Sequence, residues 1–283
     1  MPLSSLTTDS FDLTSAIFLA EASQAAYPDH LPVWSSSIEA KALFNRGNIQ
    51  GYWVADGEVA LLAFRGTDNL RQWLRDARIA PTTHPWGRVH VGFHTGLAEV
   101  ELDMAAFDAV AAKARHVWIT GHSLGGALAV LAAARLKMKG IESRVYTFGQ
   151  PAMSAFDFAE RFDAELPGRL IRFINQSDIV ARLPPALPFL NYEHCGHVKR
   201  IVRPGVLEAR RNSEASNPPP EIDETPPPPA TEAEEARLLA ALDANPDLFD
   251  ETALRPEGRL MPSFFKDHYM TEYIRLLKEM PRP

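Results

Sequence analysis

The fold of this chain is decided by the stretch Val117-Trp118-Ile119-Thr120-Gly121-His122-Ser123-Leu124-Gly125-Gly126. An apolar run ends in a serine with a glycine two residues away on each side, and an Ala- and Leu-rich run follows at once. The spacing Gly121-x-Ser123-x-Gly125 is typical of a nucleophile elbow, a sharp turn that joins a strand to a helix. Side chains at the two glycine positions would collide with the neighbouring strand or helix, which favours glycine there.

A glycine-rich corner with a solvated serine is the alternative interpretation, because a GxSxG pattern alone also occurs in ordinary turns. The β-branched run before Ser123 and the helical run after it favour the elbow. A serine hydroxyl is a weak nucleophile that must be held against a base and a substrate carbonyl. We therefore predict Ser123 as a nucleophile. The Leu124 amide, at the start of the following helix, is predicted to bind an oxyanion.

Length and composition favour a globular chain with a sizeable core. The 283 residues suffice for one large α/β domain or two small ones, and 46% of them are hydrophobic. The net charge of −7 argues against nucleic acid as a partner. This charge is concentrated in residues 212–235, which hold seven acids and neither Lys nor Arg, so that the other 29 acids balance the 29 bases.

Cys195 is the single cysteine, so an intrachain disulfide is excluded. The first ten residues hold no Lys or Arg and no long apolar core, unlike a secretory signal, and we expect a cytoplasmic protein. The uncharged run 117–134 is interrupted by a strand–turn–helix pattern, which lipid does not tolerate. Zinc-type Cys/His spacing is missing from the sequence, and we expect neither metal nor cofactor.

Apolar runs of strand and helix type alternate along the chain. Asp56-Gly57 between two strand-like runs predicts a hairpin. The alternation predicts an α/β fold in one domain over residues 1–283, with a mostly parallel central sheet and helices on both faces. Predicted strands cover 49–55, 58–64, 144–148, 170–175 and 197–202, with 88–93 extended; predicted helices cover 13–27, 69–77, 98–114, 156–162 and 264–280.

Residues 206–257 differ in composition and are predicted to form a flexible insertion or flap before the C-terminal helix. Seven prolines fall within the twelve residues 218–229, interleaved with acids, a composition that favours extended polyproline II chain. Thr231 and Glu234 have the spacing of a capping box, which predicts a short helix over 233–242. The sequence leaves open whether the insertion is a lid, a binding arm or a disordered loop.

A serine nucleophile needs a histidine base and a carboxylate that orients it, in the chain order Ser, Asp or Glu, His. Asp178 follows the predicted strand 170–175 and qualifies as the acid, although an Asp that caps a turn is the alternative. Three histidines follow Ser123. His194 and His197 border the next strand and are expected to pack there, whereas His268 lies beside the final helix and is predicted as the base.

A second oxyanion donor is expected from a loop after an early strand. Gly66-Thr67 follows the predicted strand 58–64, so we predict the Thr67 amide as this donor. The alternative is that Thr67 or Asp68 caps the predicted helix 69–77, and one loop can serve both purposes.

Five motifs occur in one order along the chain: Phe64-Arg65-Gly66-Thr67, Val91-Gly92-Phe93, the elbow, Thr147-Phe148-Gly149-Gln150-Pro151, and Asp178-Ile179-Val180-x-x-Leu183-Pro184-Pro185. In these motifs the chain resembles the class 3 (fungal-type) lipase family of α/β hydrolases, over about residues 16–202 and again around His268. The resemblance implies the α/β-hydrolase fold and a triad of Ser123, Asp178 and His268. It also implies Thr67 and Leu124 as the oxyanion pair.

The resemblance implies a lid just after Thr67, at residues 68–81. There Leu70, Trp73, Leu74 and Ile79 either contact an acyl chain or pack on the core. The chain departs from the family at Ala152, where an arginine is usual. It also departs from the secreted members, which have signal peptides and disulfides. Ester hydrolysis inside a cell is therefore favoured over hydrolysis of bulk fat outside it.

Together these residues predict a lipase or esterase of lipid degradation, which cleaves carboxylic esters of lipid-like substrates through an acyl-enzyme. A phospholipase or thioesterase with the same triad is an alternative. A non-catalytic protein that binds through its Pro-rich arm is another. The expected partner is a small-molecule ester or lipid, without nucleic acid or a transmembrane segment. Transient contact with a membrane surface, the acyl length, the head group and the oligomeric state stay open.

Overall fold

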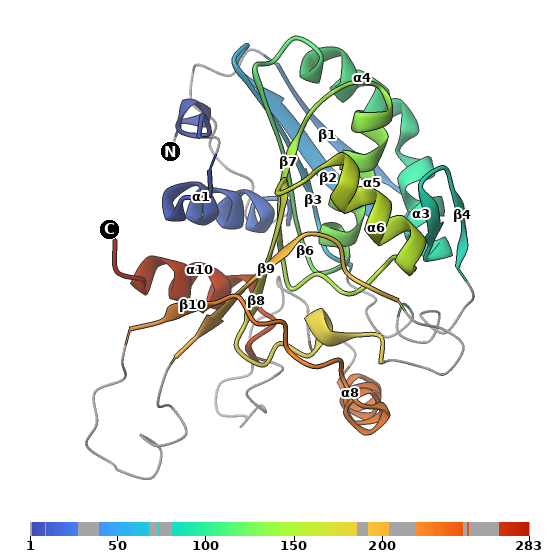
Figure 1. The fold of residues 1–283 in the computed structure, drawn as a ribbon, viewed down its shortest axis with the longest axis vertical. Coiled ribbons are helices and arrows are strands. Elements are labelled where there is room, and N and C mark those ends of the chain that lie inside the picture. The colour runs from blue at the N-terminus through green and yellow to red at the C-terminus, as the bar shows by residue number, and fades with distance from the viewer. Residues whose placement is uncertain are drawn as a thin grey trace.

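An eight-stranded sheet lies in the middle of the molecule (Figure 1). The structure is a computed structural model, and it describes residues 2–8, 10–27, 40–67, 73, 81–185, 192–203, 219–245, 248 and 266–282. Its strand order is β1-β2-β3-β6-β7-β8-β9-β10. The strands are β1 (Ala40–Arg46), β2 (Ile49–Ala55), β3 (Val59–Phe64), β6 (His116–His122), β7 (Arg144–Phe148), β8 (Leu170–Asn175), β9 (His197–Val202) and β10 (Glu221–Asp223).

The five strands from β3 to β9 in this order are parallel to one another, and β1, β2 and β10 are antiparallel to their neighbours. This confirms the predicted α/β fold with a mostly parallel centre. The hairpin at Asp56-Gly57 is also confirmed, because β2 and β3 pair on either side of it and the Asp56 carboxylate accepts the Val59 amide at 2.8 Å. A separate two-stranded ribbon joins β4 (Thr82–His84) to β5 (Gly87–Val89).

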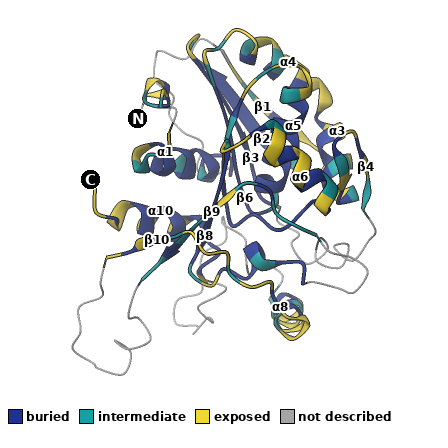
Figure 2. Ribbon diagram, viewed as in Figure 1, coloured by how far each residue is buried: buried dark blue, intermediate teal, exposed yellow. Residues whose placement is uncertain are grey.

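Helices cover both faces of the sheet (Figures 1 and 2). On one face lie α1 (Leu13–Gln24) and α10 (Met270–Glu279); on the other lie α3 (Val91–Glu99), α4 (Glu101–Ala111), α5 (Leu124–Met138) and α6 (Phe156–Glu165). Each face has its own hydrophobic core. Helix α5 is buried from Gly125 to Leu136, which explains why its sequence is apolar all round rather than on one stripe.

Two sequence predictions differ from the structure near α3. Residues 91–93 are helical rather than extended, because the His90 ring Nδ1 accepts the Gly92 amide and so caps α3. The predicted helix 98–114 is two helices, with α3 ending and α4 beginning on either side of the buried Val100. Strand β1 was not predicted. The predicted helix 69–77 lies outside the described residues except for Trp73.

The described part of the predicted insertion packs on the body of the protein. Strand β10 pairs with β9, and α8 (Glu232–Ala244) begins with the predicted capping box of Thr231 and Glu234. Leu238 and Leu242 of α8 are at most 1% exposed and belong to the same core as α3 to α6. Strand β10 and helix α8, within residues 219–245, are therefore packed elements and not only a solvated flap. The rest of 206–257, apart from residue 248, lies outside the described residues.

Candidate active site

The turn between β6 and α5 has the geometry of a nucleophile elbow. Ser123 has φ 56° and ψ −128°, a strained conformation for a residue with a side chain, and it precedes the first residue of α5. A Cβ on Gly121 would lie 2.3 Å from the carbonyl oxygen of Gly125, and a Cβ on Gly125 would lie 2.5 Å from that of Phe64. Helix and strand backbones therefore approach so closely that only glycine fits at both positions, as the sequence indicated.

Three loops bring the predicted triad residues together. Ser123 follows β6, Asp178 follows β8, and His268 lies in the turn before α10. The His268 Nε2 atom lies 3.0 Å from the Ser123 Oγ atom, and its Nδ1 atom lies 2.9 Å from Oδ2 of Asp178. All three residues are at most 4% exposed. Because a carboxylate only accepts, Nδ1 donates to Asp178 and Nε2 accepts from the serine hydroxyl.

Tyr273 on α10 holds the Asp178 carboxylate. Its hydroxyl donates to Oδ2 of Asp178 at 2.7 Å and accepts the Asn175 amide at 2.9 Å. Burial, and then the Asp178 charge, raise the pKa of Tyr273 well above its ordinary value, so the phenol keeps its proton and stays a donor. The Val180 amide donates to the other carboxylate oxygen at 2.9 Å. The role of Tyr273 was not predicted from the sequence, although a tyrosine on a buried helix face needs a partner for its hydroxyl.

His122 supports the backbone that carries His268. The Nε2 atom of His122 lies 2.8 Å from the His268 carbonyl oxygen, and its Nδ1 atom lies 2.8 Å from the Tyr27 hydroxyl. Since the carbonyl only accepts, Nε2 carries the hydrogen and Nδ1 accepts from Tyr27. Burial, and then the nearby His268, lower the pKa of His122 well below its ordinary value. The neutral His122 ring is thus a fixed support, which sequence analysis also missed.

Asp267 places a second carboxyl group behind the triad. Its Oδ2 atom accepts the Ser177 amide at 3.2 Å, and its carbonyl accepts from the Asn175 side chain at 2.9 Å. Burial is the main cause that raises the pKa of Asp267 to about 7, and the charge of Asp178 adds to it. Both contacts join the loop that carries the predicted base to the loop that carries the predicted acid.

The two predicted oxyanion donors lie on either side of Ser123. Leu124 is the first residue of α5, where backbone amides have no acceptor within the helix. Thr67 follows Gly66, at which an added Cβ would lie 3.1 Å from Cβ of Ser123. The loop after β3 therefore runs directly past the serine. The roles of both amides stay predictions.

Of the remaining site candidates, Trp73 is 7% exposed and packs in the core with its ring 5.8 Å from that of Phe93. Leu70, Leu74 and Ile79, with most of the predicted lid 68–81, lie outside the described residues. His194 donates from Nε2 to the Ala181 carbonyl at 3.1 Å, in agreement with a packing role. The same expectation for His197 is wrong, because this residue is exposed at the start of β9.

The described residues hold no group of three or more His, Cys, Asp or Glu side chains placed to bind a metal ion. None of the helices they form has the length and apolar character needed to cross a membrane.

Comparison with known proteins shows what the central part of the chain is similar to. Residues 61–187 match the model of the family described as "Lipase (class 3)". The lipase of Rhizomucor miehei is 32% identical over 169 residues, which cover 55% of this chain and 44% of that protein. Secreted mono- and diacylglycerol lipase 1 of Fusarium solani is 33% identical over 140 residues, which cover 47% of this chain and 41% of that protein. The chain thus spans less than half the length of these two curated relatives.

A solved structure extends the likeness of the fold beyond the matched segment. The crystal structure of an MDLA mutant from Penicillium cyclopium is 19% identical with a TM-score of 0.61, over 92% of this chain and 96% of that chain. The segment that matches the family model includes Ser123 and Asp178, and His268 lies beyond it. Over residues 61–187, the chain is thus similar to the class 3 lipase family.

Proposed function

We propose that this chain hydrolyses carboxylic esters of lipid-like substrates, as a lipase or esterase, through an acyl-enzyme on Ser123. The observation that carries the proposal is the buried chain of hydrogen bonds from Ser123 through His268 to Asp178, with distances of 3.0 and 2.9 Å. A serine of purely structural use needs neither a strained turn nor a base held by a buried carboxylate.

The arrangement supports a reaction in two steps. As Oγ of Ser123 attacks the ester carbonyl carbon, its proton passes to Nε2 of His268. The charge that develops on the carbonyl oxygen faces the Leu124 and Thr67 amides. When the intermediate collapses, the bond from carbon to the alcohol oxygen breaks, and His268 gives its proton to the departing alcohol. The acyl group then stays on Ser123.

Water completes the cycle by the reverse sequence of proton transfers. His268 takes a proton from water while the water oxygen attacks the acyl carbon. The bond from carbon to Oγ breaks, His268 returns the proton to Ser123, and the carboxylic acid leaves. In both steps Asp178 holds Nδ1 of His268 and stabilises the imidazolium, and its burial strengthens this attraction because the surroundings have a low dielectric constant.

The first test is hydrolysis of p-nitrophenyl esters from acetate to palmitate by the wild type and by Ser123→Ala. We expect turnover by the wild type and a loss of about 10⁴-fold or more in the variant, whose fold is checked by circular dichroism. Turnover that survives in Ser123→Ala would contradict the proposed nucleophile. No turnover of any ester by folded wild-type protein would favour the binding-protein alternative.

A second series of substrates tests which class of lipid the protein hydrolyses. The names of the relatives, a lipase and a mono- and diacylglycerol lipase, support acylglycerols. Release of fatty acid from mono-, di- and trioleoylglycerol is therefore compared with release from dioleoylphosphatidylcholine and from oleoyl coenzyme A, each with Ser123→Ala as the blank. A preference for the phospholipid or for the thioester would replace acylglycerol hydrolysis by the corresponding alternative.

A further inference from the structure

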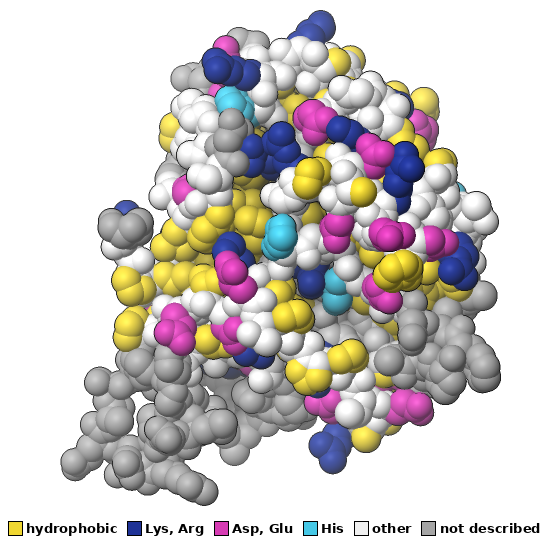
Figure 3. All heavy atoms as spheres, in the orientation of Figure 1, with side chains coloured by type: hydrophobic (Ala, Val, Ile, Leu, Met, Phe, Trp, Pro, Cys, Tyr) yellow, Lys and Arg dark blue, Asp and Glu magenta, His cyan; other side chains and the backbone are white. Residues whose placement is uncertain are grey.

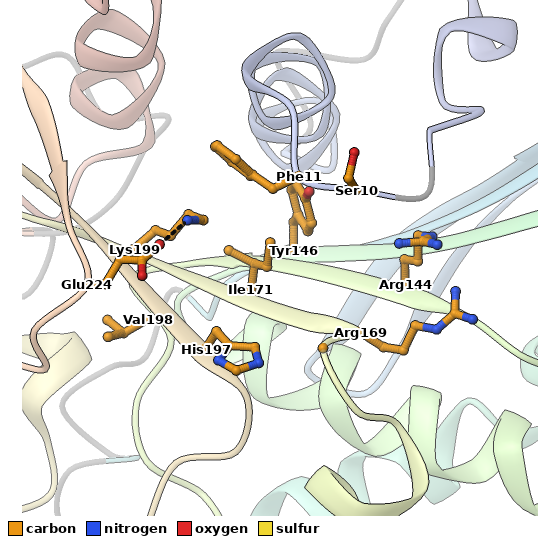
Figure 4. A pocket seen from close by; sticks show the side chains of 11 residues that line it. Ser10, Phe11, Arg144, Tyr146, Arg169, Ile171, His197, Val198, Lys199 and Glu224 are labelled. Carbon is orange, nitrogen blue, oxygen red and sulfur yellow. Dashed lines mark hydrogen bonds and ion pairs between the residues drawn. The ribbon is translucent and has the colours of Figure 1, made fainter.

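A pocket of about 360 Å³ lies near the amino ends of strands β7, β8 and β9 (Figure 4). Arg144 is the first residue of β7, Arg169 directly precedes β8, and His197 is the first residue of β9. These strands are parallel neighbours, so their amino ends meet at one edge of the sheet. The side chains of Arg144, Tyr146, Arg169, Ile171, His197 and Lys199 contribute to its lining.

Strand register explains why these side chains share one face. Tyr146 is paired with Ile171, and Ile171 with His197, so the three form a row across the sheet. Because side chains alternate between faces along a strand, Arg144 and Lys199 point to the same side as this row. Tyr146 and Ile171 form the apolar floor, and Arg144 and Arg169 lie together at one end of it (Figure 4).

The lining is strongly basic. It holds the permanent cations Arg144, Arg169 and Lys199 but one carboxylate, Glu224, which already pairs with Lys199 at 2.6 Å. The Arg169 side chain makes no hydrogen bond or ion pair with another described residue. Guanidinium groups bind carboxylates and phosphates through paired N–H donors. The end of the pocket with the two arginines therefore has the chemistry of an anion site.

An apolar groove of about 750 Å³ adjoins the basic pocket, and Phe11 lines both. The groove lies between the start of α1, strand β10 and residues 280–282. Its lining is mainly apolar, with Leu13, Ile17 and Met280, and the charged Asp12, Glu221 and Arg282 also contribute to it. Phe11 is 36% exposed, and the Lys199 ammonium lies 4.4 Å from its ring centroid. On the face seen in Figure 3, hydrophobic side chains gather in a hollow beside basic ones.

We propose that the basic pocket and the apolar groove together bind one single-chain anionic amphiphile. Its carboxylate or phosphate head group contacts Arg144 and Arg169, and its hydrocarbon chain passes Phe11 into the groove. A fatty acid and a lysophospholipid share this chemistry. The volume of the groove falls in the range of small-molecule sites, about 300–1,000 Å³.

The amphiphile site is separate from the triad. Strand β8 has Arg169 before its first residue and Asp178 beyond its last, so the two sites lie at opposite ends of one strand. A fatty acid is what the proposed hydrolysis would release, and that link to a product rests on the proposed function. Binding itself does not require turnover and can be measured without it.

The experiment measures oleate binding by titration calorimetry on full-length protein with Ser123→Ala, below the critical micelle concentration. When Arg144→Gln and Arg169→Gln are added to the Ser123→Ala protein, we expect oleate to bind at least about tenfold more weakly, because two charge-assisted contacts to the head group are lost. The matched control removes two other arginines, Arg88 and Arg161, which form surface ion pairs with Asp157 and Glu165. This control is expected to bind oleate like its parent. Circular dichroism and melting temperature check the fold of every variant.

Two further ligands distinguish the sources of the head group. Oleoyl lysophosphatidate tests a phosphate head group, and monooleoylglycerol supplies the same chain without charge. Binding of either anion that depends on Arg144 and Arg169 supports the site and tells which head group it takes. Binding of monooleoylglycerol as tight as that of oleate would overturn the role of charge.

A photoreactive oleate with a diazirine in its chain locates the ligand directly. We expect the photoreactive oleate to label peptides from residues 11–17 or 219–222. Label confined to peptides around Ser123, or oleate binding unchanged by Arg144→Gln with Arg169→Gln, would overturn the proposal. Equal loss of binding in the Arg88 and Arg161 control would also overturn it. Failure of the proposed hydrolysis would instead be seen in wild-type turnover and would leave these binding results unchanged.

Discussion

Polar side chains are buried at the carboxyl ends of the parallel strands and exposed to solvent at the amino ends. At the carboxyl ends, Ser123, Asp178 and His268 are at most 4% exposed and connected by short hydrogen bonds. At the amino ends, the side chain of Glu224 is 72% exposed where it pairs with Lys199, and cations outnumber carboxylates in the lining of the pocket. The two groups share strand β8, with Arg169 just before it and Asp178 just after it, so the difference comes from what covers each end of the strand.

Loss of a single polar atom should cost more at the buried end of the strands than at the solvated end. In a buried network each donor is matched to an acceptor, and removal of one partner leaves the other without a bond and away from water. At a solvated edge, water replaces a lost partner at little cost. Substitutions at the triad end should therefore change turnover or stability by large factors, whereas those at the amino ends should act mainly on ligand binding.

After removal of the Ser123 hydroxyl itself, the largest of these effects is expected from Asp178→Asn. The amide can present its NH₂ group to His268, which favours the tautomer that no longer accepts the serine proton. We expect kcat for p-nitrophenyl butyrate to fall by about 10³–10⁴-fold. Asp157→Asn, which breaks a surface ion pair with Arg88, is the control and should keep its turnover. A fall of less than tenfold in Asp178→Asn would mean that Asp178 does not orient the base.

Chain order and turn chemistry predicted much of the fold. The ranges predicted for β8 and β9 agree with the structure at both ends, since residues that favour turns flank both segments. Strand β1 was not predicted because it lies at the edge of the sheet, where Leu43 is 64% exposed, and because apolar and polar residues do not alternate along it. The helix at residue 91 was missed because His90 is not among the usual capping residues.

The site residues that could be predicted are those marked by a sequence motif or by chain order. Ser123, Asp178 and His268 follow from the elbow and from chain order, and the structure brings them together. Tyr273 and Asp267 do not, because their contacts to the Asp178 loop span 95 and 90 residues of sequence and no local pattern marks them. Such partners become visible only when the packing of α10 against the sheet is known.

The next effect in size is expected from Tyr273→Phe. This change leaves the ring in place but removes the hydroxyl that donates to Asp178 and accepts from Asn175. Loss of one such buried bond costs about 1–3 kcal/mol, and if the loss falls on the transition state, kcat drops about 10- to 100-fold with KM unchanged.

Tyr269→Phe is the matched control for this change. Tyr269 lies just before α10 and donates its hydroxyl to the Leu248 carbonyl rather than to the Asp178 carboxylate. A drop in kcat confined to Tyr273→Phe would identify the contact to Asp178 as the cause. Equal losses in both variants would show that buried hydroxyls near α10 matter for packing alone.

Asp267→Asn tests the triad end through stability rather than turnover. Because burial raises the pKa of Asp267 to about 7, the folded protein keeps a proton that the unfolded chain has already lost above about pH 4. The contribution of Asp267 to the free energy of unfolding of the wild type therefore declines between about pH 4 and pH 7 and stays constant above about pH 7. The amide of the variant cannot ionise, so the melting temperature of the variant minus that of the wild type should rise by several degrees across this range.

Taking the difference between the two proteins isolates Asp267. Burial lowers the pKa of His84 to about 4, so this residue makes stability rise with pH between about pH 4 and pH 6.5, but it does so equally in both proteins. A difference that does not change with pH would show that Asp267 ionises in the folded protein as it does in the unfolded chain.

The smallest effect is expected at the amino ends, from Glu224→Gln. The Lys199 ammonium holds the pKa of this carboxyl below its ordinary value, but the carboxylate is exposed, so water replaces the lost partner. We expect the melting temperature to change by less than about 2 °C, and this change should vanish in 1 M salt, where the Debye length is about 3 Å. The loss of kcat in Tyr273→Phe should persist in the same salt, because that bond is buried and salt does not reach it. A stability loss in Glu224→Gln that is large and insensitive to salt would break the contrast, since it would place a buried, matched contact at the amino ends as well.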